Sequence, residues 1–167
     1  NVLFLNENFA QTAPSGHSNG YIKTVGSSTY SVYQGNSDTN GVNGSSDDML
    51  AYCFAEKQGY SKFGTYEANN STDGPFVYTG FQPSFLILKA IDQTGNWFIF
   101  DNKRDTDNAV SQILYPDSSA AEGSAAVLDF VSNGVKIRNS GSGGINHSGT
   151  YIYMAFAEHP FVSSKGV

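Results

Sequence analysis

Nucleophilic catalysis requires a serine or cysteine within reach of a histidine that a carboxylate orients. Serine is abundant in this chain, and the three histidines are His17, His147 and His159. The serine in "GYSKF" comes nearest to nucleophile-elbow spacing, but the closing glycine is missing. All three histidines stand in polar stretches or just past an apolar run, which indicates solvent-exposed side chains. The pattern therefore predicts a protein that is not an enzyme.

Acidic side chains gather in two places where oxygen ligands for calcium could converge. Asp101, Asp105 and Asp107 stand in "DNKRDTDN", and Asp47 and Asp48 follow a Gly/Asn-rich stretch. The competing interpretation is that these acids keep strand ends soluble and cap turns. No H-E-x-x-H, paired C-x-x-C, G-x-x-x-x-G-K or G-x-G-x-x-G motif occurs. We predict no metal and no cofactor, with the aspartates of "DNKRDTDN" as weak metal candidates.

Recognition of a sugar by aromatic stacking is the commonest binding chemistry that we expect of a β module of this composition. Trp97, the sole tryptophan, is the first candidate for such stacking. Its neighbours Phe98, Ile99 and Phe100 are apolar, so packing inside a sheet is the competing interpretation. The single cysteine, Cys53, cannot form an internal disulfide. Because it stands in an apolar run, we expect a small buried hydrophobic side chain.

The composition favours an all-β protein and excludes two classes of partner. The chain of 167 residues is 14% charged and 14% aromatic and has 18 glycines. Aromatic residues favour strands, and Gly, Asn, Asp and Ser favour the turns between them. The net charge of −6 argues against nucleic-acid binding, which needs clustered lysine and arginine. No apolar run approaches the ~20 residues that cross a bilayer, so no membrane insertion is expected.

Alternating and apolar runs place the expected strands. "FLILKAI" predicts a buried strand, "NWFIFDN" follows it after a "DQTG" turn, and "VLDFVSNGVKIRN" predicts a hairpin. In that hairpin, Asn133 and Gly134 are expected to supply the two positive-φ positions of a type I′ turn. "SSAAEGSAAVLDF" allows one short helix or a loop. The product is an antiparallel β-sandwich, jelly-roll-like, with strands near 60–67, 75–80, 84–91 and 96–101.

Two apolar runs end in the same three residues, Phe-Ala-Glu, and are apolar at every preceding position, which indicates a duplicated unit. "MLAYCFAE" at 49–56 matches "YIYMAFAE" at 151–158, and each follows a Gly-rich polar stretch and a short alternating strand. Glu56 and Glu158 recur at equivalent positions, which favours one shared structural role. The first copy has no counterpart of residues 60–110, so it is expected to be truncated at its N-terminus. The predicted division is a partial copy over 1–59 and a complete copy over 60–167.

The start of the chain is the predicted assembly element. "VLFLNENF" reads as an apolar strand whose neighbours within its own copy are missing. An exposed apolar edge invites pairing with another chain. We therefore assign Val2, Leu3, Phe4 and Leu5 to assembly between subunits.

Three long strings carry a family resemblance that covers nearly the whole chain. They are "AYCFAEKQGYSKFGTYEANNSTDGPFVYTGFQPSFLILK", "GNWFIFDNKRD" and "SGTYIYMAFAEHPF". They resemble an uncharacterised repeat domain found near the C-termini of bacteriophage tail-fibre and virion structural proteins, often with concanavalin A-like domains. That family has no established catalytic residues to carry over.

The resemblance implies a virion structural or adhesive module, located on the virion surface and therefore extracellular. A tail fibre, a head fibre and a capsid decoration all fit it. Such modules usually act as homo-oligomers, with trimers favoured, and contact other virion proteins and a host surface glycan. Two alternatives stay open: a carbohydrate-binding or depolymerising fibre tip, and a non-viral extracellular filament-forming protein.

Overall fold

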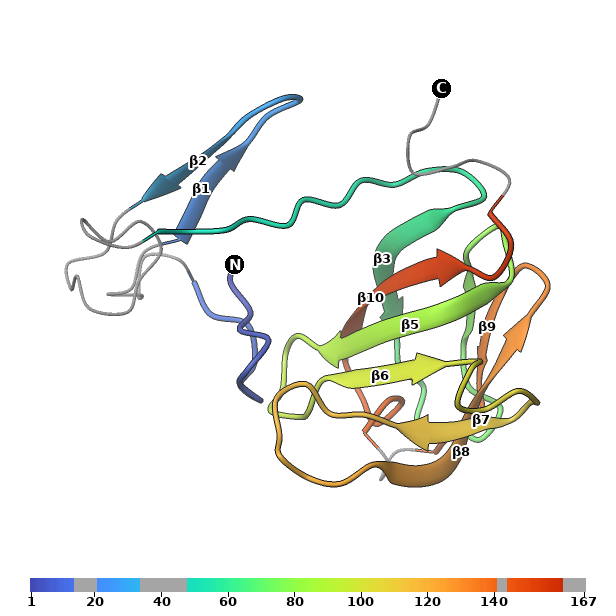
Figure 1. Cartoon of the computed structure of the whole chain (residues 1–167). Helices are drawn as coiled ribbons and strands as arrows, with labels where there is room; N and C mark the ends of the chain where they lie inside the picture. Colours follow the sequence, from blue (N-terminus) through green and yellow to red (C-terminus); the bar gives the residue numbers. More distant parts are fainter. Residues whose placement is uncertain (14–20, 34–47, 141–143, 161–167) are drawn as a thin grey trace. The chain divides into compact units, whose positions relative to one another are not determined.

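The computed structural model describes residues 1–13, 21–33, 48–140 and 144–160 (Figure 1). The chain divides into two compact units. The first comprises Asn1–Leu3 and Gln11–Phe54, and the second comprises Phe4–Ala10 and Ala55–Val167. The second unit holds the packed core.

In its described residues, the first unit contains one antiparallel hairpin. Strand β1 (Tyr21–Val25) pairs with β2 (Tyr30–Tyr33), with an irregularity in register after Ile22. The Gly26 amide donates to the Thr29 carbonyl at 2.7 Å and closes the connecting turn. An isolated bridge also joins Val2 to Thr12. A two-stranded ribbon is marginally stable by itself.

The second unit is built from two four-stranded antiparallel sheets (Figure 1). The first sheet has the order β3-β10-β5-β6, with bounds Ser61–Glu67, Thr150–Ala157, Pro83–Ala90 and Phe98–Asp101. The second has the order β4-β9-β8-β7, with bounds Phe76–Tyr78, Gly134–Ile137, Gly123–Val131 and Val110–Ile113. The packing of these sheets confirms the predicted all-β sandwich.

The sandwich is tied together along one edge and open along the other. Ile99 in β6 and Leu114, just past β7, exchange two backbone hydrogen bonds of 2.9 and 3.1 Å. This bridge links the first sheet to the second. The strands at the opposite ends of the two sheet orders, β3 and β4, form the open edge.

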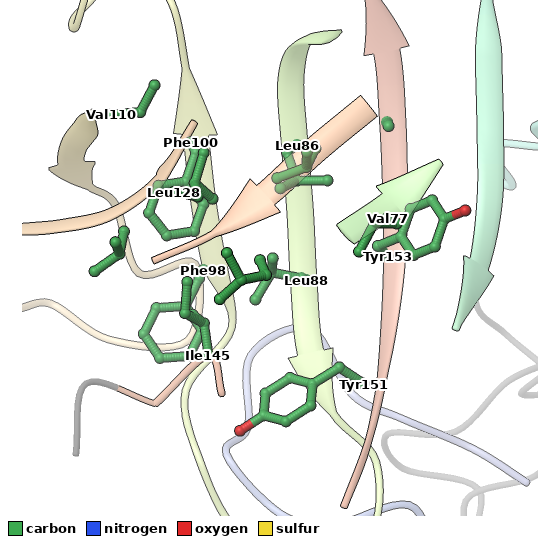
Figure 2. Close-up of a cluster of buried hydrophobic side chains, with 14 of the residues drawn as sticks. Val77, Leu86, Leu88, Phe98, Phe100, Val110, Leu128, Ile145, Tyr151 and Tyr153 are labelled. Atoms are coloured by element: carbon green, nitrogen blue, oxygen red, sulfur yellow. The ribbon is translucent and has the colours of Figure 1, made fainter. Parts of the chain in front are cut away.

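Alternation along the strands builds the core, because successive side chains point to opposite faces. In β10, Tyr151, Tyr153 and Ala155 are buried, while the residues between them are partly exposed. Tyr151 stacks on Tyr66 of β3 with ring centroids 5.1 Å apart. Figure 2 shows buried side chains from both sheets and from the loop before β10: Val77, Leu86, Leu88, Phe98, Phe100, Val110, Leu128, Ile145, Tyr151 and Tyr153.

A buried asparagine organises the loops next to this core. Asn146 is fully buried, and its Nδ2 lies 2.8–2.9 Å from acceptors on Asn69, Ser71 and Asn139. Its Oδ1 accepts the Asn69 amide at 2.8 Å. Buried polar groups are tolerated when they are hydrogen-bonded, so this side chain fixes two loops that are distant in sequence.

Two local predictions need correction. Strand β8 occupies Gly123–Val131, and no helix occurs in the described parts of the chain, so the short helix allowed in "SSAAEGSAAVLDF" is absent there. The hairpin between β8 and β9 forms, but Asn133 and Gly134 do not have positive φ. Gly134 begins β9 instead, where its missing side chain makes room for β4. Nor does any described segment form a helix that could span a membrane.

Replacing Gly134 by alanine is expected to destabilise the second unit. A Cβ there would collide with the Val77 carbonyl oxygen and lie 2.8 Å from the Phe76 ring. Overpacking of this kind typically costs about 1–3 kcal/mol. Thermal unfolding followed by Trp97 fluorescence measures it. Gly95→Ala is the matched control, because nothing lies within 4 Å of its Cβ position; equal melting temperatures for the two variants would contradict the prediction.

Candidate functional site

The predicted metal candidates are engaged in a turn. Asp101 accepts the amides of Lys103 and Arg104 at 2.9 Å and the Arg104 Nε at 2.6 Å. Partial burial opposes ionisation of Asp101, but the hydrogen bonds from Arg104 outweigh it and lower the pKa of this carboxyl. Asp105 accepts the amides of Ser111 and Gln112. Within the described residues, no group of three or more His, Cys, Asp or Glu side chains could hold a metal.

Trp97 anchors the N-terminal segment. Its side chain is partly exposed, and its indole Nε1 donates to the Phe4 carbonyl at 2.8 Å. The Gly95 amide donates to the Asn8 carbonyl at 2.9 Å. Residues 4–10 therefore belong to the second unit, and 1–10 form no strand in the structure.

The four residues assigned to assembly lie in different settings. Val2 exchanges backbone hydrogen bonds with Thr12 at 2.9 and 3.1 Å, and Phe4 accepts from Trp97. Leu3 is partly exposed, and Leu5 is 53% exposed. The prediction that residues 2–9 form an apolar edge strand is therefore wrong, because this segment forms no strand and bonds within its own chain. An assembly role for these residues stays a prediction.

A buried lysine lies beneath the same N-terminal segment. Lys89 is fully buried, and its Nζ donates to the Ala90 carbonyl at 2.8 Å. It also lies 3.4 Å from the carbonyls of Asn8 and Gln93. Burial lowers the pKa of this ammonium group, because the surrounding carbonyls replace water only in part.

The remaining reactive side chains of the described segments do not converge. His147 and His159 are exposed, and the His147 Nδ1 contacts the neighbouring Ser148 hydroxyl at 3.0 Å; His17 lies outside the described residues. Cys53 is exposed rather than buried. That prediction is wrong because residues 48–56 form no strand, so Cys53 does not point into a two-sheet core as the inward side chains of β10 do.

A pocket of about 330 Å³ opens at the free edge of the sandwich, between the start of β3 and the end of β4. A tight turn forms one wall, since the amides of Tyr60 and Ser61 donate to the Lys57 carbonyl at 3.0 and 2.9 Å. Gly59 has φ +70°, which a residue with a side chain rarely adopts. The lining residues are Glu56, Lys57, Gln58, Gly59, Ser61, Lys62, Tyr78, Thr79 and Gly80.

The opposite wall is an exposed aromatic side chain on a fixed backbone. Tyr78 is 63% exposed, and its ring and hydroxyl lie 3.6–3.8 Å from the Cβ position of Gly80. Gly80 has φ +83°, and its amide and that of Thr79 donate to the Asn133 carbonyl. The buried Thr79 hydroxyl donates to the Phe81 carbonyl at 2.5 Å. These bonds hold the end of β4 and so fix where Tyr78 stands.

An ion pair supplies polarity to the pocket. The Lys62 Nζ lies 2.5 Å from the Glu56 Oε1. This hydrogen bond lowers the pKa of the Glu56 carboxyl and raises that of the Lys62 ammonium. Both groups therefore stay charged near neutral pH. Glu158, the equivalent of Glu56 in the predicted repeat, pairs with Lys103 at 2.8 Å.

Sequence reasoning missed this pocket for an identifiable reason. Tyr78 is one of 10 tyrosines, and nothing in "FVYTGF" marks it as exposed. The available signal was strand alternation, which puts Phe76 and Tyr78 on one face and Val77 on the other. Only the structure shows that Val77 faces the core and that Phe76 and Tyr78 are exposed.

The first unit has an apolar groove of its own, of about 690 Å³. Leu50 and Tyr52 are 77% and 79% exposed, and Val25 is 80% exposed. Most of its surface is apolar, whereas the surface of the open-edge pocket is divided almost equally between polar and apolar atoms. Its lining residues are Ile22, Val25, Tyr30, Val32, Met49, Leu50, Ala51, Tyr52, Cys53 and Phe54.

These features define a β-sandwich module with an apolar groove in one unit and a polar, aromatic-walled pocket in the other. Residues 1–160 match the model of one protein family, described as a domain of unknown function, DUF7483. The chain belongs to that family. No curated protein and no solved structure matches it.

Stability of the second unit is expected to depend on the charge of Lys89. Because burial lowers its folded-state pKa below the ordinary value of 10.5, the unfolded chain binds this proton more tightly. Stability should then rise with pH from the lowered folded pKa up to about 10.5. Lys89→Met removes this rise. Urea unfolding between roughly pH 7 and 10, read by Trp97 fluorescence, measures the difference.

Lys23→Met serves as the control for Lys89→Met, because Lys23 is exposed on β1. It should keep the pH dependence of the unaltered protein. Parallel profiles of stability against pH for the unaltered protein and Lys89→Met would contradict the prediction, because they would show that the pKa of Lys89 is the same in the folded and the unfolded chain.

Proposed function

We propose that this protein is a non-enzymatic structural and adhesive module of a bacteriophage particle. It forms part of a tail fibre, a head fibre or a capsid decoration, at the virion surface and in contact with other virion proteins. Support comes from the three strings that resemble a repeat domain of virion proteins and from the β-sandwich fold.

The observation that carries self-assembly is the apolar groove of the first unit. Soluble monomers rarely expose contiguous apolar patches of large size, and those that do often use them as interfaces. Met49, Leu50 and Tyr52 are 57%, 77% and 79% exposed in a segment that forms no strand. The matching run in the second unit is β10, which pairs on both sides. A strand from another copy could pair with residues 49–56 in the same way.

A homo-oligomer, with a trimer favoured, follows from the adhesive role. Several copies bound to one particle convert weak contacts into avidity when the geometry allows them to engage together. Covering the groove between copies would also remove apolar surface from water.

Leu50→Asp together with Tyr52→Asp is expected to weaken self-association. Two carboxylates in the groove would have to lose water in any interface that covers it. We expect the oligomer measured by light scattering after size exclusion to shift to monomer. Leu5→Asp tests the competing site, since Leu5 is an exposed leucine of the predicted N-terminal assembly element. If Leu5→Asp dissociates the oligomer and the double variant does not, assembly uses the N-terminal segment instead.

The virion role is tested by electron microscopy of native material with an antibody against this chain. Label on phage tails or heads would support the proposal and identify the appendage. Label on particle-free filaments would overturn it in favour of a non-viral extracellular filament-forming protein.

One further function has a specific observation behind it, namely glycan binding. The pocket at the open edge of the sandwich combines an exposed tyrosine with charged and amide side chains. Glu56 is the one carboxylate among its lining residues, all of which are described. Glycoside cleavage uses two carboxylates that flank the bond, so the pocket favours binding of a sugar over depolymerisation.

A further inference from the structure

The pocket at the open edge has the size and rigidity of a binding site. Its volume of about 330 Å³ falls at the lower end of ligand pockets, which span roughly 300–1,000 Å³. Both walls are held by backbone bonds: the Lys57–Ser61 turn on one side, and on the other the Asn133 carbonyl, which fixes Gly80. A ligand would therefore meet a largely preformed surface.

Tyr78 supplies an aromatic surface at the rim of this pocket. Its side chain is 63% exposed at the end of β4. A tyrosine ring offers an apolar face and a polar hydroxyl. Sugar rings present the matching combination, with C–H groups on one face and hydroxyls around the edge.

Hydrogen-bond donors and acceptors line the opposite wall. Glu56 offers carboxylate acceptors, Lys62 and Lys57 offer ammonium donors, and the Gln58 amide offers both. Glu56 and Lys62 neutralise each other at 2.5 Å. Lys57 remains as one positive charge in excess on a chain whose net charge is −6. The pocket therefore favours a ligand that carries an acidic group.

We propose that the pocket between β3 and β4 binds an acidic saccharide, one that carries a carboxylate, as uronic acids and sialic acids do. The sugar ring stacks on Tyr78, its hydroxyls bond to the Glu56–Lys62 pair and Gln58, and its carboxylate faces Lys57. The inference rests on the adhesive part of the proposed function and names the class of receptor.

The test uses the whole purified protein on a printed array of neutral glycans and of glycans that contain uronic or sialic acid. Binding to one or more acidic glycans is the expected result, and affinity for the best array hit is then measured by calorimetry. No binding, or a preference for neutral glycans, would overturn the proposal.

Tyr78→Ala is expected to weaken that affinity by about tenfold or more, since loss of a stacked ring removes most of the apolar contact. Phe76→Ala is the matched control, because Phe76 is 48% exposed on the same strand and does not line the pocket. Unchanged affinity in Tyr78→Ala, or an equal loss in both variants, would place the sugar elsewhere. Circular dichroism confirms that each variant is folded.

Lys57→Gln tests the charge. It should weaken binding of the acidic glycan and also flatten the decrease of affinity with added salt, because exposed charge pairs are screened. An unchanged salt dependence would exclude Lys57 as the partner of the carboxylate. Since these measurements use purified protein, a positive result stands even if microscopy places the protein outside virions. Antibody label on virions with no glycan bound would in turn overturn only this inference.

Discussion

Strand β10 is the element on which the first sheet of the second unit depends. β3 and β5 lie on either side of it and pair with it, not with each other. Pairing β10 with β3 joins segments more than eighty residues apart, so a long loop must close before these hydrogen bonds form. Burial of the inward tyrosines, with Tyr151 stacked on Tyr66, offsets that loss of chain entropy.

The same kind of sequence behaves differently in the two units. Residues 151–158 contribute to β10, while residues 49–56, which share its final Phe-Ala-Glu and its apolar character, form no strand. The preference for strands depends on neighbours and burial more than on the backbone itself. The β1–β2 hairpin is the one sheet of the described first unit, and it leaves apolar side chains of residues 49–56 exposed. This difference between residues 49–56 and β10 connects the fold to the proposed assembly.

The pocket is a consequence of how the sandwich closes. The Ile99–Leu114 bridge ties one edge, and the pocket lies at the other, where β3 begins and β4 ends. An edge strand with free backbone groups is a risk for aggregation. Here the short β4 and the turn before β3 limit that edge, and they also enclose the polar pocket with Tyr78 at its rim.

The sequence by itself determined the fold class, the positions of the main strands and the β5–β6 and β8–β9 hairpins of the second unit, because alternation and turn residues act locally. It also ranked Trp97 and the aspartates of "DNKRDTDN" as candidates by residue type alone. Only the tertiary structure decided that Trp97 anchors residue 4, that Gly134 makes room for β4, and that Cys53 and Tyr78 are exposed. Exposure and close approach depend on which strands pack together, and that follows from pairings between distant segments.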